Sequence, residues 1–208
     1  MKATITSLIF LLLSLTVSSQ TYKYIGIEEG LSNQKIYKIQ KDARGYMWFL
    51  THVGIDQYNG KEIKHYKLRE GNRELDPLLN INWTFLDKTG TLLVTGKQGR
   101  IFRYDSGHDR FVQIYNMYNY WNKDYHAFVR YSYIDQEDNV WLCGKSAIHL
   151  FNIESGQKQQ ISNRLGNITC IEQINSEHFF IGTDKRIYLA KLENGNLKEL
   201  SCGKLGMM

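Results

Sequence analysis

Proline, cysteine and long apolar runs are scarce in this sequence. One proline and three cysteines occur in 208 residues. After residue 19, no apolar run approaches the about 20 residues of a membrane span. Cys143, Cys170 and Cys202 are not paired at the spacing of zinc ligands. The sequence therefore predicts neither a collagen-like chain nor a zinc domain, and no spanning helix after residue 19.

Motifs for catalysis, nucleotide binding and metal binding are also missing. No Gly-x-Ser-x-Gly elbow occurs, and the six histidines form no i, i+4 pair. Gly144-Lys145-Ser146 lacks the glycine that a phosphate-binding loop has five residues earlier. Asp135–Asn139 lacks the sixth-position glycine and the final glutamate of a calcium loop. We expect turns at both places, with no cofactor, no metal and no enzymatic activity.

Basic residues are not gathered into a patch. Lys and Arg number 26 against 21 Asp and Glu, a net charge of +5, and they are scattered among the acidic residues. A solvated surface explains this pattern better than nucleic-acid binding does. The composition, 42% hydrophobic with 14 tyrosines, allows real cores and favours strands over helices.

Residues 1–19 differ in kind from the rest. Lys2 supplies a short positive start, residues 8–17 form a compact apolar core, and Val17-Ser18-Ser19 provides small residues for a signal peptidase. We interpret this segment as a signal peptide cleaved before Gln20; the alternative is an uncleaved N-terminal anchor. The sequence thus predicts a periplasmic product, residues 20–208, which contacts the membrane only if the segment is retained.

The stretch 30–66 contains one complete copy of a repeated pattern. Turn-forming residues separate its apolar segments, as expected for four short strands. Ile36 and Ile39 indicate a half-buried first strand, and 47–50 is apolar throughout, as in a strand covered on both faces. The parts in order are Gly30-Leu31-Ser32-Asn33, Ile36 and Ile39, Asp42-Ala43-Arg44-Gly45, Met47-Trp48-Phe49-Leu50-Thr51, Gly54-Ile55, Tyr58-Asn59-Gly60, and Ile63 with Tyr66.

The same order of parts returns three times. Aligning Trp48, Leu93, Trp141 and Phe180 gives spacings of 45, 48 and 39 residues, with an isoleucine 7 or 8 residues after each. This regularity indicates a repeated core with variable loops, and such a period with four strands per repeat predicts a β-propeller. The expected blades cover approximately 30–66, 80–115, 127–162 and 167–200.

The first copy resembles the periplasmic regulator-propeller repeat of hybrid two-component sensors from Bacteroidetes. Typical members read Gly-Leu-Ser-Asn, then Asp-x-x-Gly-x-Met-Trp-Phe-Gly-Thr, then Gly-Leu-x-x-Tyr-Asp-Gly. The matching residues are Gly30-Leu31-Ser32-Asn33, Asp42, Gly45, Met47-Trp48-Phe49, Thr51, Gly54, Tyr58 and Gly60. Leu50 replaces the usual glycine and Ile55 the usual leucine.

This resemblance implies an all-β, incomplete seven-bladed propeller with four blades present, acting as the ligand-sensing part of a sensor whose kinase lies outside this chain. Such sensors respond to glycan breakdown products and regulate polysaccharide utilisation, and a full-length relative is anchored in the inner membrane. The implied partners are an oligosaccharide and, in the full-length protein, a second copy. A stand-alone secreted propeller that binds glycan or protein is the alternative, and a propeller enzyme such as a polysaccharide lyase is a third.

An aromatic insertion, 115–126, lies between the second and third copies. Its rings could stack on sugar faces while its amides bond to hydroxyls; the alternative is that they pack between blades. We expect ligand contacts from Tyr118, Tyr120, Trp121 and Tyr125.

Cys143 and Cys170 lie in apolar strand patterns, which favours buried thiols. The alternative is a disulfide between these two residues, which would link equivalent parts of neighbouring repeats.

Overall fold

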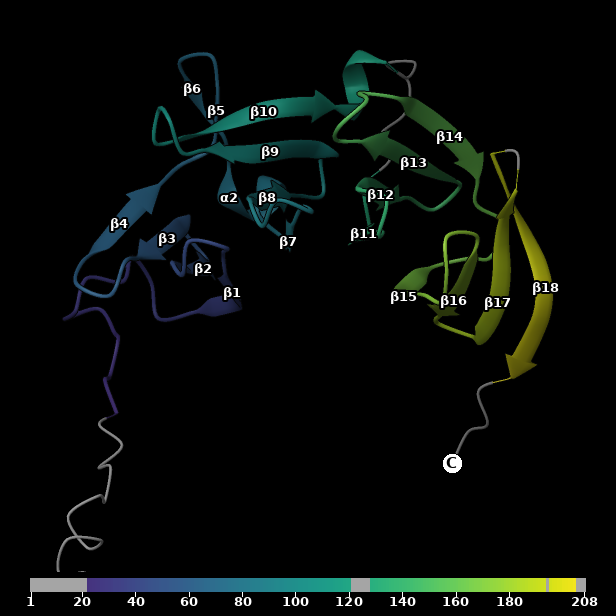
Figure 1. Ribbon diagram of the computed structural model, residues 1–208, viewed down its shortest axis with the longest axis horizontal. Coiled ribbons are helices and arrows are strands. Elements are labelled where there is room, and N and C mark those ends of the chain that lie inside the picture. Colours follow the sequence, from purple (N-terminus) through teal and green to yellow (C-terminus); the bar gives the residue numbers. More distant parts are fainter. Residues whose placement is uncertain (1–21, 121–127, 194, 205–208) are drawn as a thin grey trace, which may run out of the picture.

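The computed structural model describes residues 22–120, 128–193 and 195–204. These residues form four antiparallel sheets of four strands each, set side by side in an open arc (Figure 1). We call the sheets blades 1 to 4 in chain order. The predicted all-β class, with propeller-like blades of four antiparallel strands, is confirmed. Blades 1 and 4 do not meet in the part of the chain that the structure describes (Figure 1).

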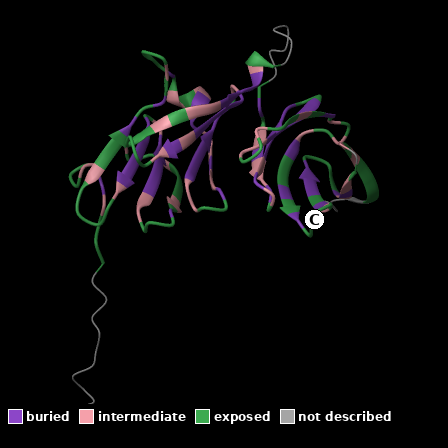
Figure 2. Cartoon of the chain, turned by 45° about the horizontal axis from the view of Figure 1, so that its top comes forward, coloured by how far each residue is buried: buried purple, intermediate pink, exposed green. Residues whose placement is uncertain are grey.

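Each blade runs from a first strand on the concave side of the arc to a fourth strand on its outer side. The first strands β1, β7, β11 and β15 contact one another in sequence around the arc. Burial is concentrated on the central strands, and residues 196–201 of the last strand of blade 4 are largely exposed (Figure 2). The strands are β1 (Ile36–Lys41), β2 (Met47–Thr51), β3 (Ile55–Tyr58) and β4 (Ile63–Tyr66); β7 (Trp83–Leu86), β8 (Leu92–Thr95), β9 (Arg100–Asp105) and β10 (Arg110–Asn116); β11 (Tyr131–Ile134), β12 (Asn139–Cys143), β13 (Ala147–Asn152) and β14 (Lys158–Ser162); and β15 (Ile168–Gln173), β16 (His178–Thr183), β17 (Arg186–Glu193) and β18 (Asn196–Lys204).

In blades 1 to 3, the turn between the first two strands is held by an aspartate. In blade 1, Asp42 Oδ1 accepts hydrogen bonds from the backbone amides of Arg44 and Tyr46, both at 3.0 Å. Gly45 has a φ of +88°, which a residue with a side chain rarely adopts. The Asp-x-x-Gly sequence is therefore a turn whose side chain replaces water at the backbone amides.

The positions aligned in the sequence, those of Trp48, Leu93, Trp141 and Phe180, are equivalent in three dimensions. Each lies six residues after the residue whose amide closes the turn: Asp42, Asp87, Asp135 and Ile174. In blades 1 to 3, the aligned side chains are fully buried against the next blade. Trp48 lies 4.7 Å from Tyr104 of blade 2, and Trp141 lies 4.8 Å from Phe179 of blade 4, measured between ring centroids.

Three residues expected in the core are exposed, and the expectation was wrong for each. Phe180 is 48% exposed because it faces the side of blade 4 that no other blade covers. Cys170 is exposed on the same face. Ile39 is 52% exposed on the opposite face of blade 1, and a bulge between Ile36 and Lys38 interrupts the alternation expected there.

The thiols of Cys143 and Cys170 are both free, so the alternative of a disulfide between them is not realised. Cys143 is buried as expected, and burial raises the pKa of its thiol. Among the described residues, none of the helices has the length and apolar character needed to cross a membrane.

A small hairpin and a helical turn between blades 1 and 2 were not expected. The hairpin consists of β5 (Arg69–Glu70) and β6 (Arg73–Glu74), and the helix is α2 (Pro77–Asn80). Asp76 caps the helix by accepting a hydrogen bond from the Leu78 amide at 2.9 Å. Strand β5 contacts β10, so the hairpin lies over the outer edge of blade 2.

Candidate functional site

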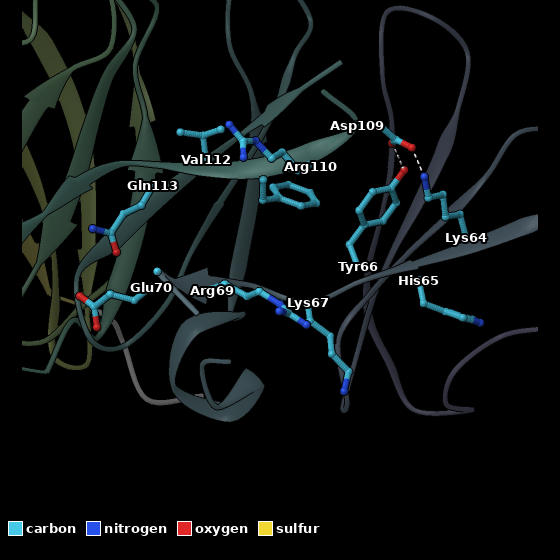
Figure 3. A pocket seen from close by; sticks show the side chains of 12 residues that line it. Lys64, His65, Tyr66, Lys67, Arg69, Glu70, Asp109, Arg110, Val112 and Gln113 are labelled. Atoms are coloured by element: carbon cyan, nitrogen blue, oxygen red, sulfur yellow. Dashed lines mark hydrogen bonds and ion pairs between the residues drawn. The ribbon is translucent and has the colours of Figure 1, made fainter. Parts of the chain in front are cut away.

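A cavity of about 630 Å³ lies at the outer rim between blades 1 and 2. Its walls come from β4, the β5–β6 hairpin and β10 (Figure 3). The size suits a small molecule, since ligand cavities typically measure about 300–1,000 Å³. The lining residues are Lys64, His65, Tyr66, Lys67, Arg69, Glu70, Gly71, Asp109, Arg110, Phe111, Val112 and Gln113.

Asp109 organises one side of this rim cavity. It accepts hydrogen bonds on Oδ1 from the hydroxyls of Tyr66, at 2.5 Å, and Tyr104, at 2.6 Å. Its other oxygen pairs with Lys64, and Figure 3 shows Lys64 and Tyr66 both pointing at it. Asp109 has a φ of 51°, an uncommon backbone conformation for a residue other than glycine. Burial and the hydrogen bond with Tyr104 raise the pKa of the Tyr66 hydroxyl further above its ordinary value.

A cluster of aromatic rings packs between blades 1 and 2, next to the cavity. Trp48, Tyr66, Tyr104 and Phe111 form a cluster with centroid distances between 4.7 and 5.7 Å. Such offset and edge contacts hold rings in place beyond the effect of burial alone. Two members of the cluster, Tyr66 and Phe111, also line the cavity. The wall is therefore built on the interface between two blades.

The charges on the opposite wall are unevenly paired. Glu70 accepts from Arg73 at 2.6 Å and lies 3.5 Å from Arg100, while Lys67 pairs with Glu74 at 2.7 Å. Arg69 and Arg110 are exposed, and neither forms a side-chain hydrogen bond or ion pair with any residue that the structure describes. The Arg69 side chain lies on the side of β10 that carries Phe111 and Gln113, whereas Arg110 points to the other side of this strand (Figure 3).

Gln113 adds an unused acceptor. Its Oε1 atom is buried and has no hydrogen-bond partner among the described residues. A buried acceptor without a donor costs free energy, about 1–3 kcal/mol. A ligand hydroxyl or amine that reached this atom would remove that cost.

The predicted aromatic site lies elsewhere, next to blades 2 and 3. Tyr118 is half-buried and packs on the core between these blades, within the 3₁₀ turn η2 (Met117–Asn119). Tyr120 is 53% exposed. Its ring is parallel to that of Tyr115 with the centroids 5.6 Å apart, and the Lys158 amine lies 4.0 Å from its centroid. Trp121 and Tyr125 lie outside the described residues, so a ligand site at these four aromatics stays a prediction.

The two segments judged to be turns are turns. Gly144–Ser146 connects β12 to β13, with the Gly144 amide bonded to the Ala147 carbonyl at 2.8 Å. Asp135 accepts from the Asn139 amide at 2.8 Å in the turn before β12. Within residues 22–120, 128–193 and 195–204, no three His, Cys, Asp or Glu side chains group closely enough to hold a metal ion.

The residues of the rim cavity were missed by sequence reasoning, although a local signal exists. Gly71-Asn72 is a two-residue turn dipeptide between the pairs Arg69-Glu70 and Arg73-Glu74, and Gly71 has a φ of +59°. This pattern predicts a hairpin. The contact of that hairpin with β10 depends on the packing of two blades and has no local signal.

Comparison with known proteins identifies the first repeat. Residues 30–52 match the family described as two component regulator propeller. The match confirms the resemblance that Gly30–Asn33 and Met47–Thr51 carry. No curated protein matches the sequence.

Several solved structures share the fold. One is the extracellular domain of BT3049, described as a hybrid two component system from B. thetaiotaomicron; it has a TM-score of 0.64 and 17% identity over 86% of this chain. The corresponding domain of BT4673 from the same organism has a TM-score of 0.58 and 16% identity over 89% of the chain. BamB from Moraxella catarrhalis has a TM-score of 0.52 and 14% identity, covering 82% of this chain and 49% of its own.

The present chain spans about a quarter, 26%, of the length of the BT3049 and BT4673 structures. At such low identities the similarity establishes the shared propeller fold.

Proposed function

We propose that this chain, which carries a regulator propeller repeat at residues 30–52, is part of the extracytoplasmic ligand-sensing domain of a hybrid two-component sensor. The observation that carries the proposal is the combination of that repeat with a four-blade arc that superposes over 86% of its length on an extracellular domain described in those terms. The ligand class is glycan breakdown products, and the response is transcription of polysaccharide-utilisation genes. The kinase that transmits the signal belongs to other parts of the sensor.

The uncovered face of blade 4 supports a larger propeller in the working sensor. Phe180 and Ile187 are 48% and 45% exposed at positions that face away from blade 3. In the first three blades, the aligned side chain is covered by the next blade. An immunoblot of the native host with an antibody against blade 1 tests this part of the proposal. A polypeptide far larger than the 24.4 kDa of this chain supports it, and a single band at that mass contradicts it.

The sensing role is tested by transcription. The host is grown on a panel of polysaccharides and on glucose, with the chromosomal gene carrying either Trp48→Ala or Arg164→Gln. Trp48 is fully buried between blades, so its loss should collapse the domain. Arg164 is exposed in the loop before β15 and serves as the matched control.

We expect Trp48→Ala to abolish induction of degradative genes on at least one polysaccharide, while Arg164→Gln leaves induction unchanged. Normal induction in the Trp48 variant, with its protein shown to be absent or unfolded, would refute the sensing role. That outcome favours a stand-alone secreted propeller.

A further inference from the structure

We infer that a second cavity, between β14 and the β17–β18 hairpin, is a binding site for a neutral sugar unit, which the side-chain amides of Gln157 and Gln159 hold. We call it the blade 3–4 cavity. This inference names a site and a ligand class for the proposed sensing function and rests on that function for its biological role. The physical claim of binding is argued from the cavity alone.

The blade 3–4 cavity has a volume of about 310 Å³ and lies at the outer rim of the arc. Blade 3 supplies most of its lining, from β12, β13, β14 and the residue before β14, and blade 4 supplies Leu192 of β17. Strand β14 contacts β18, and Figure 1 shows these strands side by side. A volume at the lower end of the range for ligand cavities suits one sugar unit.

The strand register places the side chains of blade 3 that concern this cavity on one face. Trp141, which packs against blade 4, lies opposite Leu150, and Leu150 lies opposite Gln159. Opposed residues of antiparallel strands project to the same face of the sheet, so Gln159 also points toward blade 4. Gln157 comes two residues earlier and shares this face. Its carbonyl accepts a hydrogen bond from the Asn152 amide at 2.9 Å, which continues the pairing of the strands.

The two glutamine side chains are free to bind a ligand. Gln157 is exposed and Gln159 is half-buried, and neither side chain forms a hydrogen bond with any residue that the structure describes. The Gln159 amide lies where a Cβ atom on Gly195 would be, so the glycine in the turn before β18 leaves room for it. Each side-chain amide offers two N–H donors and one acceptor oxygen. This combination matches sugar hydroxyls, which both donate and accept.

The two asparagines of the cavity are already engaged with the protein. Asn139 Nδ2 donates to both carboxylate oxygens of Asp135, at 3.1 and 2.9 Å, and its Oδ1 accepts from Asn152 at 2.9 Å. Asn152 Oδ1 accepts from the Ser155 amide at 2.8 Å. These bonds fix one wall of the cavity. A wall that is already ordered loses less conformational entropy when a ligand binds.

The lining favours an uncharged ligand. Lys158 is the one charged residue among the described residues that line the cavity. It lies opposite Phe151 on the other face of the sheet, where its amine is 4.0 Å from the centroid of the Tyr120 ring. Leu150 and Leu192 belong to the apolar packing between blades 3 and 4 and offer surface to the C–H groups of a sugar. A charged sugar would lose hydration here without gaining an ion pair.

Isothermal titration calorimetry on the whole chain tests the inference. The neutral probes are cellobiose, maltose, digalactose, mannobiose and xylobiose. Digalacturonate serves as the acidic counterpart of digalactose, and N-acetylglycinamide as an amide without sugar hydroxyls. We expect at least one neutral disaccharide to bind about threefold or more tightly than digalacturonate and than N-acetylglycinamide. Gln157→Leu and Gln159→Leu should each weaken that binding about fivefold, the effect expected for a hydrogen bond between neutral groups.

Gln160→Leu is the matched control, because Gln160 is an exposed glutamine of the same strand on the opposite face. It should leave binding unchanged, and circular dichroism verifies the fold of every variant. The inference is overturned if none of the neutral disaccharides binds, if digalacturonate binds as tightly, or if both Gln157→Leu and Gln159→Leu keep the wild-type affinity. An equal loss in Gln160→Leu, or equally tight binding of N-acetylglycinamide, also overturns it. The sensing role has its own transcriptional readout and survives each of these outcomes.

Discussion

The indole N–H of Trp48 donates a hydrogen bond to Asp42 Oδ2 at 3.0 Å, and Trp141 donates to Asp135 Oδ2 at 2.9 Å. In both blades the aspartate that closes the first turn also satisfies the buried indole six residues later. The repeated Asp and Trp are thus one structural unit, in which a turn residue provides the acceptor that a core tryptophan needs.

Replacing Asp42 by alanine should therefore cost more than the loss of an ordinary turn residue. The change leaves the Trp48 N–H and two backbone amides without their acceptor, and each buried unsatisfied donor costs about 1–3 kcal/mol. We expect a loss of about 2–4 kcal/mol in the free energy of unfolding, measured by urea denaturation. Asp105→Ala, in a more exposed turn, should cost less than about 1 kcal/mol. Equal losses at the two sites would contradict the shared role.

Phe180 and Trp141 occupy equivalent positions, but truncating Trp141 should lower the stability of the chain far more than truncating Phe180. Trp141→Ala removes a fully buried side chain and should destabilise the chain by about 3–5 kcal/mol. Phe180→Ser removes an exposed ring and should change stability by no more than about 0.5 kcal/mol while reducing self-association through the apolar face of blade 4. Thermal unfolding and light scattering measure the two effects. A large loss of stability in Phe180→Ser would mean that this face is covered.

His149 should make the chain sensitive to mild acid. Burial lowers the pKa of this side chain to about 4, whereas an unfolded histidine titrates near 6.5. Between these values the unfolded state binds a proton that the folded state does not, so stability is full above about pH 6.5 and falls as the pH drops toward 4. We expect the wild type to lose about 2 kcal/mol from this residue between pH 7.5 and 5, and His149→Gln to lose correspondingly less. Urea denaturation of both proteins at pH 7.5 and pH 5 measures the two losses in the free energy of unfolding.

Variants of Tyr118 and Tyr120, the two described aromatic residues of the predicted site, should distinguish a role in packing from a role in ligand binding. Tyr118→Ala should destabilise the chain by about 1–3 kcal/mol, because Tyr118 packs on the core between blades 2 and 3. Tyr120→Ala should leave stability nearly unchanged and weaken any sugar binding at the insertion. Chemical denaturation and a glycan array compare the variants. Unaltered glycan binding in Tyr120→Ala would remove this residue from the predicted site.

The all-β fold was predictable because its signals are local. The turn at Asp42–Gly45 depends on residues within five positions of one another, and the run from Met47 to Leu50 is apolar throughout. Exposure was less predictable, since it depends on which faces have neighbours. Phe180 and Ile39 look like core residues in the sequence, yet each lies on a blade face that the described chain leaves uncovered.

The rim cavity was not predictable for a related reason. Arg69 and Arg110 are 41 positions apart and are brought to one cavity only when the hairpin packs beside β10. The sequence nearby indicates a turn at Gly71-Asn72 but no partner for it. The aromatic insertion attracted the functional prediction because its residues are adjacent in sequence, which is the one kind of clustering that a single sequence displays.

The packing of one large side chain of each blade against the next blade has an evolutionary consequence. Every blade presents a large side chain on one face, at the position of Trp48. On the other face, blade 2 presents Leu92 and Val94, blade 3 presents Val140 and Leu142, and blade 4 presents Phe179 and Ile181. Both halves of each junction are therefore encoded within a single repeat. An in-frame duplication that adds a whole repeat would meet a complementary surface on either side, so gene rearrangement can lengthen or shorten such an array without inventing a new interface.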